Sequence, residues 1–233
     1  MLAARGTWAA TVELLLLRIK NVIGMPHRRP LRRLVALVGM LGAAGALTLG
    51  TGAAPAADPA LATTMKRGGL VLVLRHAGTD FSKPDQDPVD LADCRTQRNL
   101  SAQGRADARA IGRGARRLKL RIGTVLASPF CRTKETARLA FGRATVSRAL
   151  LNTVVAAHDA RWRRQIRAAR RLFGTKPPPG RLTVLVTHGS VVGDSSGLTL
   201  EEGETLVFRP LRNSRFRLLG RILPAEWRTL PAG

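Results

Sequence analysis

Three short, uninterrupted apolar runs constrain what this chain can fold into more than any other feature of its sequence. They span residues 70–74, 122–127 and 182–187. A strand with one face in water alternates apolar and polar residues, whereas a strand covered on both faces reads as a continuous apolar run. The three runs therefore predict buried parallel strands. Residues 206–208 and 216–222 are further strand candidates.

Helical patterns separate these strands. Ser101 is a suitable N-cap for a helix over residues 102–118, and further helices are expected over residues 130–141 and 158–173. Strands that alternate with helices predict an α/β fold, a three-layer sandwich with a mostly parallel central sheet flanked by helices. Because no internal repeat divides it, the segment 58–233 reads as one domain.

The segment before this domain, residues 1–57, has the layout of a secretory signal peptide. Arginines between positions 28 and 33 precede an apolar stretch over residues 34–49, and small residues ending in "APAAD" follow. A membrane anchor is the alternative, but the stretch is shorter and richer in glycine than the ~20 apolar residues of a spanning helix. We therefore expect an exported protein, periplasmic or secreted, with Met25 as an alternative start of translation.

The expected export bears on the oxidation state of Cys94 and Cys131, the two cysteines of the chain. In an oxidising compartment they pair if the fold brings them together, and two free buried thiols are the alternative. Closing a loop of this length stabilises a fold by roughly 3 to 4 kcal/mol in the chain-entropy account.

Functional residue types collect where the buried strands end. The first strand ends in Arg75 and His76, the second is followed by Ser128 and Arg132, and the third leads into His188. The carboxyl ends of parallel strands share one edge of a sheet, and ligands gather there. Two guanidiniums and two imidazoles at that edge predict a cage for a phosphoryl group, because planar guanidinium forks suit phosphate oxygens.

These motifs resemble those of the histidine phosphatase superfamily, also called phosphoglycerate-mutase-like. The family has a strand ending in Arg-His-Gly, a helix that opens with Ser-Pro-x-x-Arg, and a late strand ending in His. The corresponding stretches here are "LRHAGTD", with Ala77 in the glycine position, "SPFCRTKETA" and "LVTHGS". The stretches "QRNLSAQGRADARAIG" and "GETLVFRP" also match, so the resemblance covers residues 66–228.

The resemblance implies hydrolysis of a phosphate monoester, with His76 as the nucleophile that forms a phosphohistidine. Arg75 and Arg132 would bind the phosphoryl oxygens and disfavour protonation of His76, since a nearby like charge destabilises imidazolium. His188 would add positive charge once phosphate is bound. Because these groups neutralise the transferring oxygens, we expect no metal ion and no cofactor.

The family also uses a carboxylic acid to protonate the leaving group, at a position that varies. Glu204, in a Gly-Glu pair before a late strand, is the first candidate and Asp80 the second. Asp159 and Glu202 are further candidates. Pocket-lining roles are also open to Thr79, Gln97 and Asn99.

The strongly basic composition widens the list of partners. The chain has 39 Lys and Arg against 15 Asp and Glu, a formal net charge of +24. Such a balance attracts anions without choosing among them. Two helical runs, residues 104–121 and 160–171, carry much of the positive charge. Nucleic acid is not expected as a partner, because single-strand binding needs aromatic side chains for base stacking and Trp162 is the one aromatic residue in these runs. The expected partner is a phosphate ester, small or macromolecular, with loose association to an anionic envelope surface. A non-catalytic phosphate-recognition module and a basic envelope protein that binds an anionic polymer are the alternative functions.

Overall fold

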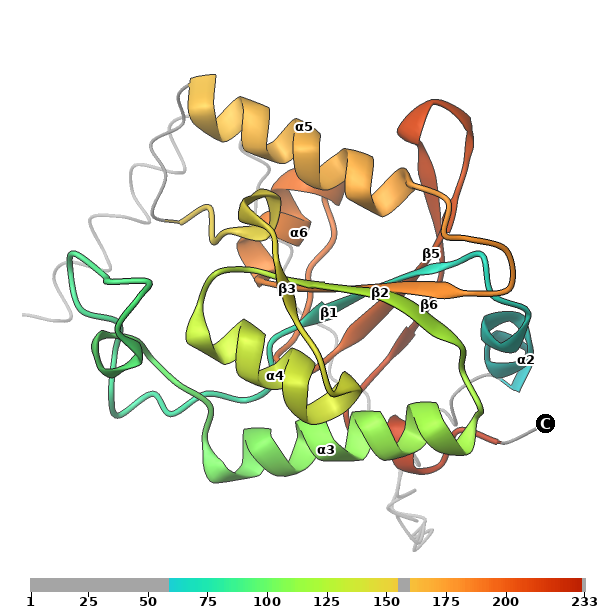
Figure 1. Ribbon diagram of the computed structural model, residues 1–233, viewed down its shortest axis with the longest axis horizontal. Coiled ribbons are helices and arrows are strands. Elements are labelled where there is room, and N and C mark those ends of the chain that lie inside the picture. The colour runs from blue at the N-terminus through green and yellow to red at the C-terminus, as the bar shows by residue number, and fades with distance from the viewer. Residues whose placement is uncertain (1–58, 155–159, 232–233) are drawn as a thin grey trace, which may run out of the picture. The chain divides into compact units, whose positions relative to one another are not determined.

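The computed structural model describes residues 59–154 and 160–231, which include a six-stranded sheet (Figure 1). The strand order is β3-β2-β4-β1-β5-β6. The strands are β1 (Val71–Arg75), β2 (Ile122–Ala127), β3 (Thr145–Val146), β4 (Leu182–Thr187), β5 (Thr205–Pro210) and β6 (Phe216–Ile222). Strands β1 to β4 pair in parallel, whereas β5 pairs antiparallel with both β1 and β6.

Helices cover both faces of this sheet. They are α2 (Pro59–Arg67), α3 (Ala102–Arg117), α4 (Cys131–Phe141), α5 (Ala160–Gly174) and α6 (Gly189–Ser196), with short 3₁₀ turns η1 (Cys94–Thr96), η2 (Arg148–Leu150), η3 (Arg212–Ser214) and η4 (Glu226–Arg228). Figure 1 shows α3 and α4 on one face and α5 and α6 on the other. The expected three-layer α/β sandwich is therefore confirmed.

Strand β1 shows why the sheet is buried on both faces. Leu72 and Leu74 pack into an apolar cluster with residues of α3 and α4, while Val71 and Val73 pack into a second cluster with residues of α5 and α6. All four side chains are at most 1% exposed. The continuous apolar run thus reflects two cores, one on each side of a central strand.

A close approach of two glycines fixes the start of α3 against the loop after β1. The Ser101 hydroxyl caps the helix by accepting the Gly104 N–H at 3.0 Å, and the Ser101 N–H donates to the Gly78 carbonyl. A Cβ at Gly104 would lie 1.9 Å from that carbonyl oxygen, so a larger residue would push the loop away from the helix. The segment that follows His76 is thereby held in place.

The structure also contains elements that the sequence analysis did not predict, namely α2, β3 and α6. The helix expected over residues 158–173 begins at Ala160, and residues 158 and 159 lie outside the described residues. The expected signal segment, residues 1–57, lies outside them as well. In the part of the chain that the structure describes, no helix has the length and apolar character needed to cross a membrane.

Candidate active site

A cavity of about 420 Å³ opens where three parallel strands end. Arg75 is the last residue of β1, Arg132 lies in the first turn of α4 after β2, and His188 is the N-cap of α6 after β4. Because β2, β4 and β1 are neighbours, these residues and His76 meet at one edge of the sheet. The cavity is lined by Arg75, His76, Arg98, Arg132, Asn152, Val154, His188, Gly189, Ser190, Thr199, Leu200 and Glu201. The lining therefore includes all four residues predicted to form the phosphate cage, Arg75, His76, Arg132 and His188.

His76 is held in one tautomer by the backbone. The side chain is 3% exposed, and its Nδ1 lies 3.0 Å from the Ala77 carbonyl oxygen. A carbonyl oxygen can only accept a hydrogen bond, so Nδ1 carries the proton. In the neutral ring the lone pair is therefore on Nε2.

The surroundings of His76 keep its ring neutral. Burial is the largest cause that lowers its pKa well below the usual 6.5, and the cationic Arg132, Arg75 and Arg98 lower it further. The hydrogen bond with Ala77 opposes this effect. A neutral ring was expected from the arginines alone, whereas in the structure desolvation contributes more.

Arg132 is buried against an aromatic ring and a carboxylate. Its side chain is 1% exposed, its guanidinium carbon lies 4.2 Å from the centre of the Phe130 ring, and Nη1 donates to Asp85 at 2.9 Å. The same Asp85 oxygen accepts the backbone N–H of Arg98 at 2.8 Å. Asp85 thus joins the loop after β1 to α4.

Arg98 is a third guanidinium that the sequence analysis missed. It lines the cavity, lies 4.2 Å above the Phe81 ring, and has Nη1 3.9 Å from a Glu202 oxygen. Its backbone carbonyl accepts a hydrogen bond from Arg132. The available signal was its place in "QRNLS", a stretch that matches the family pattern.

His188 is the second buried imidazole. Its Nε2 lies 2.9 Å from the Ser128 hydroxyl, and its ring centre lies 5.4 Å from that of His76. Burial lowers the pKa of His188 well below 6.5, and the neighbouring His76 and the cationic Arg132, Arg75 and Arg98 lower it further. These surroundings therefore favour a neutral His188.

Several buried polar atoms of these side chains have no partner. In residues 59–154 and 160–231 the buried side-chain nitrogens without a hydrogen bond are Arg75 Nε, Arg132 Nε and His188 Nδ1. All three belong to residues that line the cavity. An unpaired buried nitrogen is costly, and an anion in the cavity would bring acceptors to these residues. Among the same residues no group of three or more His, Cys, Asp or Glu side chains is arranged to hold a metal ion.

The two first candidates for the general acid do not reach the cavity. Glu204 is 3% exposed, and its carboxylate is engaged by Arg221 at 2.8 Å and by the Glu201 N–H at 2.8 Å. Asp80 accepts two hydrogen bonds from Ser82 on the loop after β1. Neither residue lines the cavity, so their assignment as general acid needs correction. Glu201 does line it, and Asp159 lies outside the described residues.

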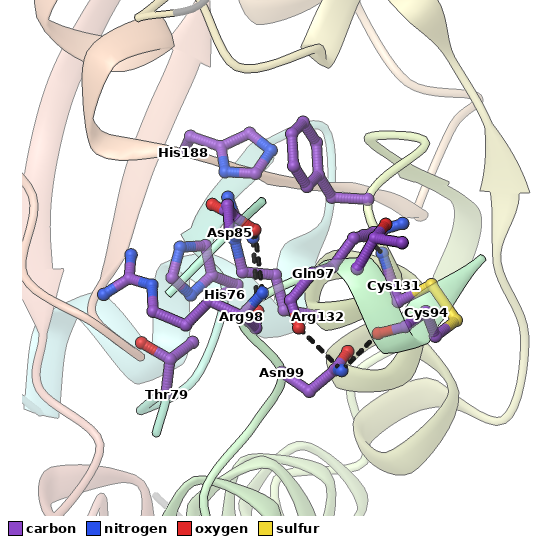
Figure 2. A network of polar contacts seen from close by, with 12 residues as sticks. His76, Thr79, Asp85, Cys94, Gln97, Arg98, Asn99, Cys131, Arg132 and His188 are labelled. Atoms are coloured by element: carbon purple, nitrogen blue, oxygen red, sulfur yellow. Dashed lines mark hydrogen bonds and ion pairs between the residues drawn. A yellow bond between two sulfur atoms is a disulfide. The ribbon is translucent and has the colours of Figure 1, made fainter. Parts of the chain in front are cut away.

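The disulfide between Cys94 and Cys131 confirms the expected pairing. It ties η1 to the start of α4, directly beside Arg132. Figure 2 shows this bond at one end of a polar network that extends towards His76 and His188. The side-chain Oε1 of Gln97 accepts the Cys131 N–H at 2.8 Å, and the side-chain amide of Asn99 donates to the backbone carbonyls of Cys94 and Gln97. Gln97 and Asn99 therefore support the site without lining it.

Removal of this disulfide is expected to weaken both the fold and the site. In the chain-entropy account, a loop of 37 residues makes the loss roughly 3 to 4 kcal/mol in the free energy of unfolding. Phosphate affinity should also fall, because the bond holds the loop of Arg98 beside Arg132. Urea unfolding and phosphate titration with and without reductant measure the two effects. A Cys94→Ser/Cys131→Ser variant should be insensitive to reductant, and equal stability of the oxidised and reduced protein would contradict the account.

Acid is expected to destabilise the fold through the two buried histidines. Both have folded-state pKa values below 6.5, so the unfolded chain binds more protons as the pH falls. Their contribution is complete above pH ~6.5 and is lost below it, by up to about 1.4 kcal/mol per pH unit for each histidine. Urea midpoints between pH 7.5 and 5 measure this slope. A His76→Gln/His188→Gln variant should show a flatter slope, and an identical slope would contradict the assignment.

No protein-family model matches the chain, and no curated protein matches it either. Solved structures do. The protein histidine phosphatase SixA with tungstate is 17% identical, with a TM-score of 0.46 over 67% of this chain and 97% of that chain. A phosphoserine phosphatase from Entamoeba histolytica is 12% identical, with a TM-score of 0.46 over 67% and 98%. A mycobacterial glucosyl-3-phosphoglycerate phosphatase is 18% identical, with a TM-score of 0.45 over 66% and 98%. All three of these neighbours are named as phosphatases.

Proposed function

We propose that this protein hydrolyses phosphate monoesters through a phosphohistidine formed on His76. The observation that carries the proposal is the state of this one side chain. The ring is buried, its Nδ1 proton is committed to the Ala77 carbonyl, and its surroundings keep it neutral at the wall of a cationic cavity. A neutral imidazole with its lone pair on Nε2 is a competent nucleophile for phosphorus.

In the first step the Nε2 lone pair forms a bond to phosphorus while the bond from phosphorus to the ester oxygen breaks. The leaving oxygen takes a proton from solvent, and the His76 ring keeps its Nδ1 proton. In the second step water attacks phosphorus and returns one proton to solvent, which offsets the proton taken up in the first step. The nitrogen–phosphorus bond breaks, and its electron pair returns to Nε2. Inorganic phosphate is released and His76 is again neutral.

Three guanidiniums supply the electrostatic part of the reaction. Arg75, Arg98 and Arg132 line the cavity and place positive charge where the phosphoryl oxygens would lie. Phosphoryl transfer depends mainly on positioning and on neutralising these oxygens. His188 would gain a proton once the phosphate dianion offsets the neighbouring cations. The proposal therefore includes no metal ion.

Turnover of an aryl phosphate in the presence of EDTA tests the proposal. We expect hydrolysis that persists after chelation and is inhibited competitively by inorganic phosphate. Loss of activity on chelation, restored by a divalent metal, would contradict the metal-independent mechanism. Phosphate binding with no turnover of any ester would overturn the enzymatic function.

That last outcome would favour the second candidate function, a phosphate-recognition module with the same fold. It is supported by the finding that neither Glu204 nor Asp80 reaches the cavity. The proposal also includes export, because of the signal-like segment before residue 58, and the disulfide is compatible with an oxidising compartment.

A further inference from the structure

The carboxylate of Glu202, beside the proposed nucleophile His76, lies within 4 Å of polar atoms of four residues. Glu202 lies in the turn between α6 and β5, with its side chain 17% exposed. One of its oxygens accepts the Thr79 hydroxyl at 2.8 Å and lies 3.4 Å from Arg75 Nη2. The same oxygen lies 3.9 Å from His76 Nδ1 and 3.9 Å from Arg98 Nη1. The other oxygen accepts the Thr79 N–H at 2.9 Å.

These contacts fix the orientation of the carboxylate. The two hydrogen bonds from Thr79 engage both oxygens, and Thr79 is itself held by a β-bridge to Leu100. Arg75 is fixed on its other side, because its Nη1 donates to the Leu200 carbonyl at 2.8 Å. Glu202 is therefore placed to hold the Arg75 guanidinium at the cavity wall.

The same placement matters for the charge on His76. When Nε2 bonds to phosphorus and Nδ1 keeps its proton, the ring becomes an N-phosphorylated imidazolium with a formal positive charge. The groups that face it are Arg75, Arg98, Arg132 and His188, which are cationic or neutral. Among the described residues, Glu202 is the carboxylate within 4 Å of a His76 ring nitrogen.

We propose that Glu202 is a positioning residue that orients Arg75 and balances the positive charge of the His76 ring during phosphorylation. This inference rests on the proposed function. It replaces the earlier candidacy of Glu202 as general acid, because both of its oxygens accept hydrogen bonds from Thr79 and one of them lies 3.9 Å from Nδ1, the ring nitrogen that keeps its proton. An opposite charge at 4 to 6 Å stabilises an ionised group by roughly 10- to 1,000-fold.

Two substitutions separate geometry from charge. Glu202→Gln keeps an acceptor for Thr79 and Arg75 but removes the negative charge, whereas Glu202→Ala removes both. The matched control is Glu135→Gln, which neutralises another carboxylate that pairs with an arginine, Arg105, and does not line the cavity. Single-turnover phosphorylation by an aryl phosphate and titration with inorganic phosphate are measured for each variant.

For Glu202→Gln we expect phosphorylation at least about 10-fold slower, with phosphate affinity equal to or higher than that of the wild type, since a negative charge near the anion is lost. Glu202→Ala should lose phosphate affinity as well, and Glu135→Gln should phosphorylate at close to the wild-type rate. Wild-type phosphorylation in Glu202→Gln would overturn the proposal. A parallel loss of rate and affinity in that variant would also overturn it, because that pattern indicates structural damage.

Failure of the proposed function would give a different result. If the wild type forms no phosphoenzyme, phosphate titration still tests the positioning of Arg75. Weaker binding in Glu202→Ala but not in Glu202→Gln would support that role, and unchanged binding in both would refute it.

Discussion

Replacing His76 with alanine is expected to lower kcat for an aryl phosphate by at least about 10³-fold, because removal of a nucleophile abolishes the covalent route. Inorganic phosphate should still bind, since Arg75, Arg98 and Arg132 remain at the cavity. The fold should also persist, because His76 lines the cavity and belongs to neither of the two large apolar clusters. Steady-state kinetics and phosphate titration of the two proteins measure these effects.

The matched control is His188→Ala, which removes the second buried imidazole of the same cavity. It should slow turnover but leave the covalent intermediate detectable, because Nε2 of His76 is still present. A His76→Ala protein with more than a tenth of wild-type kcat would contradict the account, since another group would then have to attack phosphorus.

Replacing Arg132 with lysine is expected to lower kcat/KM by roughly 10²-fold, although the positive charge remains. A guanidinium presents a planar fork of donors, and an ammonium does not. Here the fork stacks on Phe130 at 4.2 Å and donates to Asp85 and the Arg98 carbonyl. A lysine at this position loses these contacts, so the free energy of unfolding should fall by roughly 1 to 3 kcal/mol.

Arg95→Lys is the control for this substitution. Arg95 also pairs with an aspartate, Asp93, but its side chain is 91% exposed. An exposed pair contributes little, so the unfolding free energy and kcat/KM should both stay close to those of the wild type. Equal effects of the two lysine variants would show that the buried fork of Arg132 has no special role.

The buried strands could be predicted from the sequence because each one is a continuous apolar run. Strands β2 and β4 have the expected bounds, and β1 is shifted by one residue, since the apolar residues recur without interruption. Helix α2 gave no such signal. It is nine residues long and is stabilised by burial of Leu61, Ala62 and Met65 against the sheet, a tertiary effect that local pattern does not reveal.

Site residues that follow the end of a strand could be predicted from the sequence, whereas a site residue in a loop could not. Arg75, His76 and His188 follow from the strand pattern, and Arg132 from the turn after β2. Arg98 reaches the cavity through contacts made across the chain by Asp85 and by the disulfide.

Glu204 is the converse case, because its position in the sequence suggests a site residue and the structure places it outside the cavity. It sits where a catalytic carboxylate was expected, but Arg221 from the antiparallel β6 binds it outside the cavity. The pairing of β5 with β6 decides which residue faces that carboxylate, and no local pattern around Glu204 reports it.

The most direct test of the account is to trap the covalent intermediate. The protein is mixed with a radiolabelled aryl phosphate, quenched in denaturant at alkaline pH, and digested so that the labelled peptide can be identified. The account expects an acid-labile, base-stable label on His76 that forms at least as fast as turnover and is absent from His76→Ala. A label on His188, or steady turnover with no labelled protein, would contradict the central claim that His76 is the nucleophile.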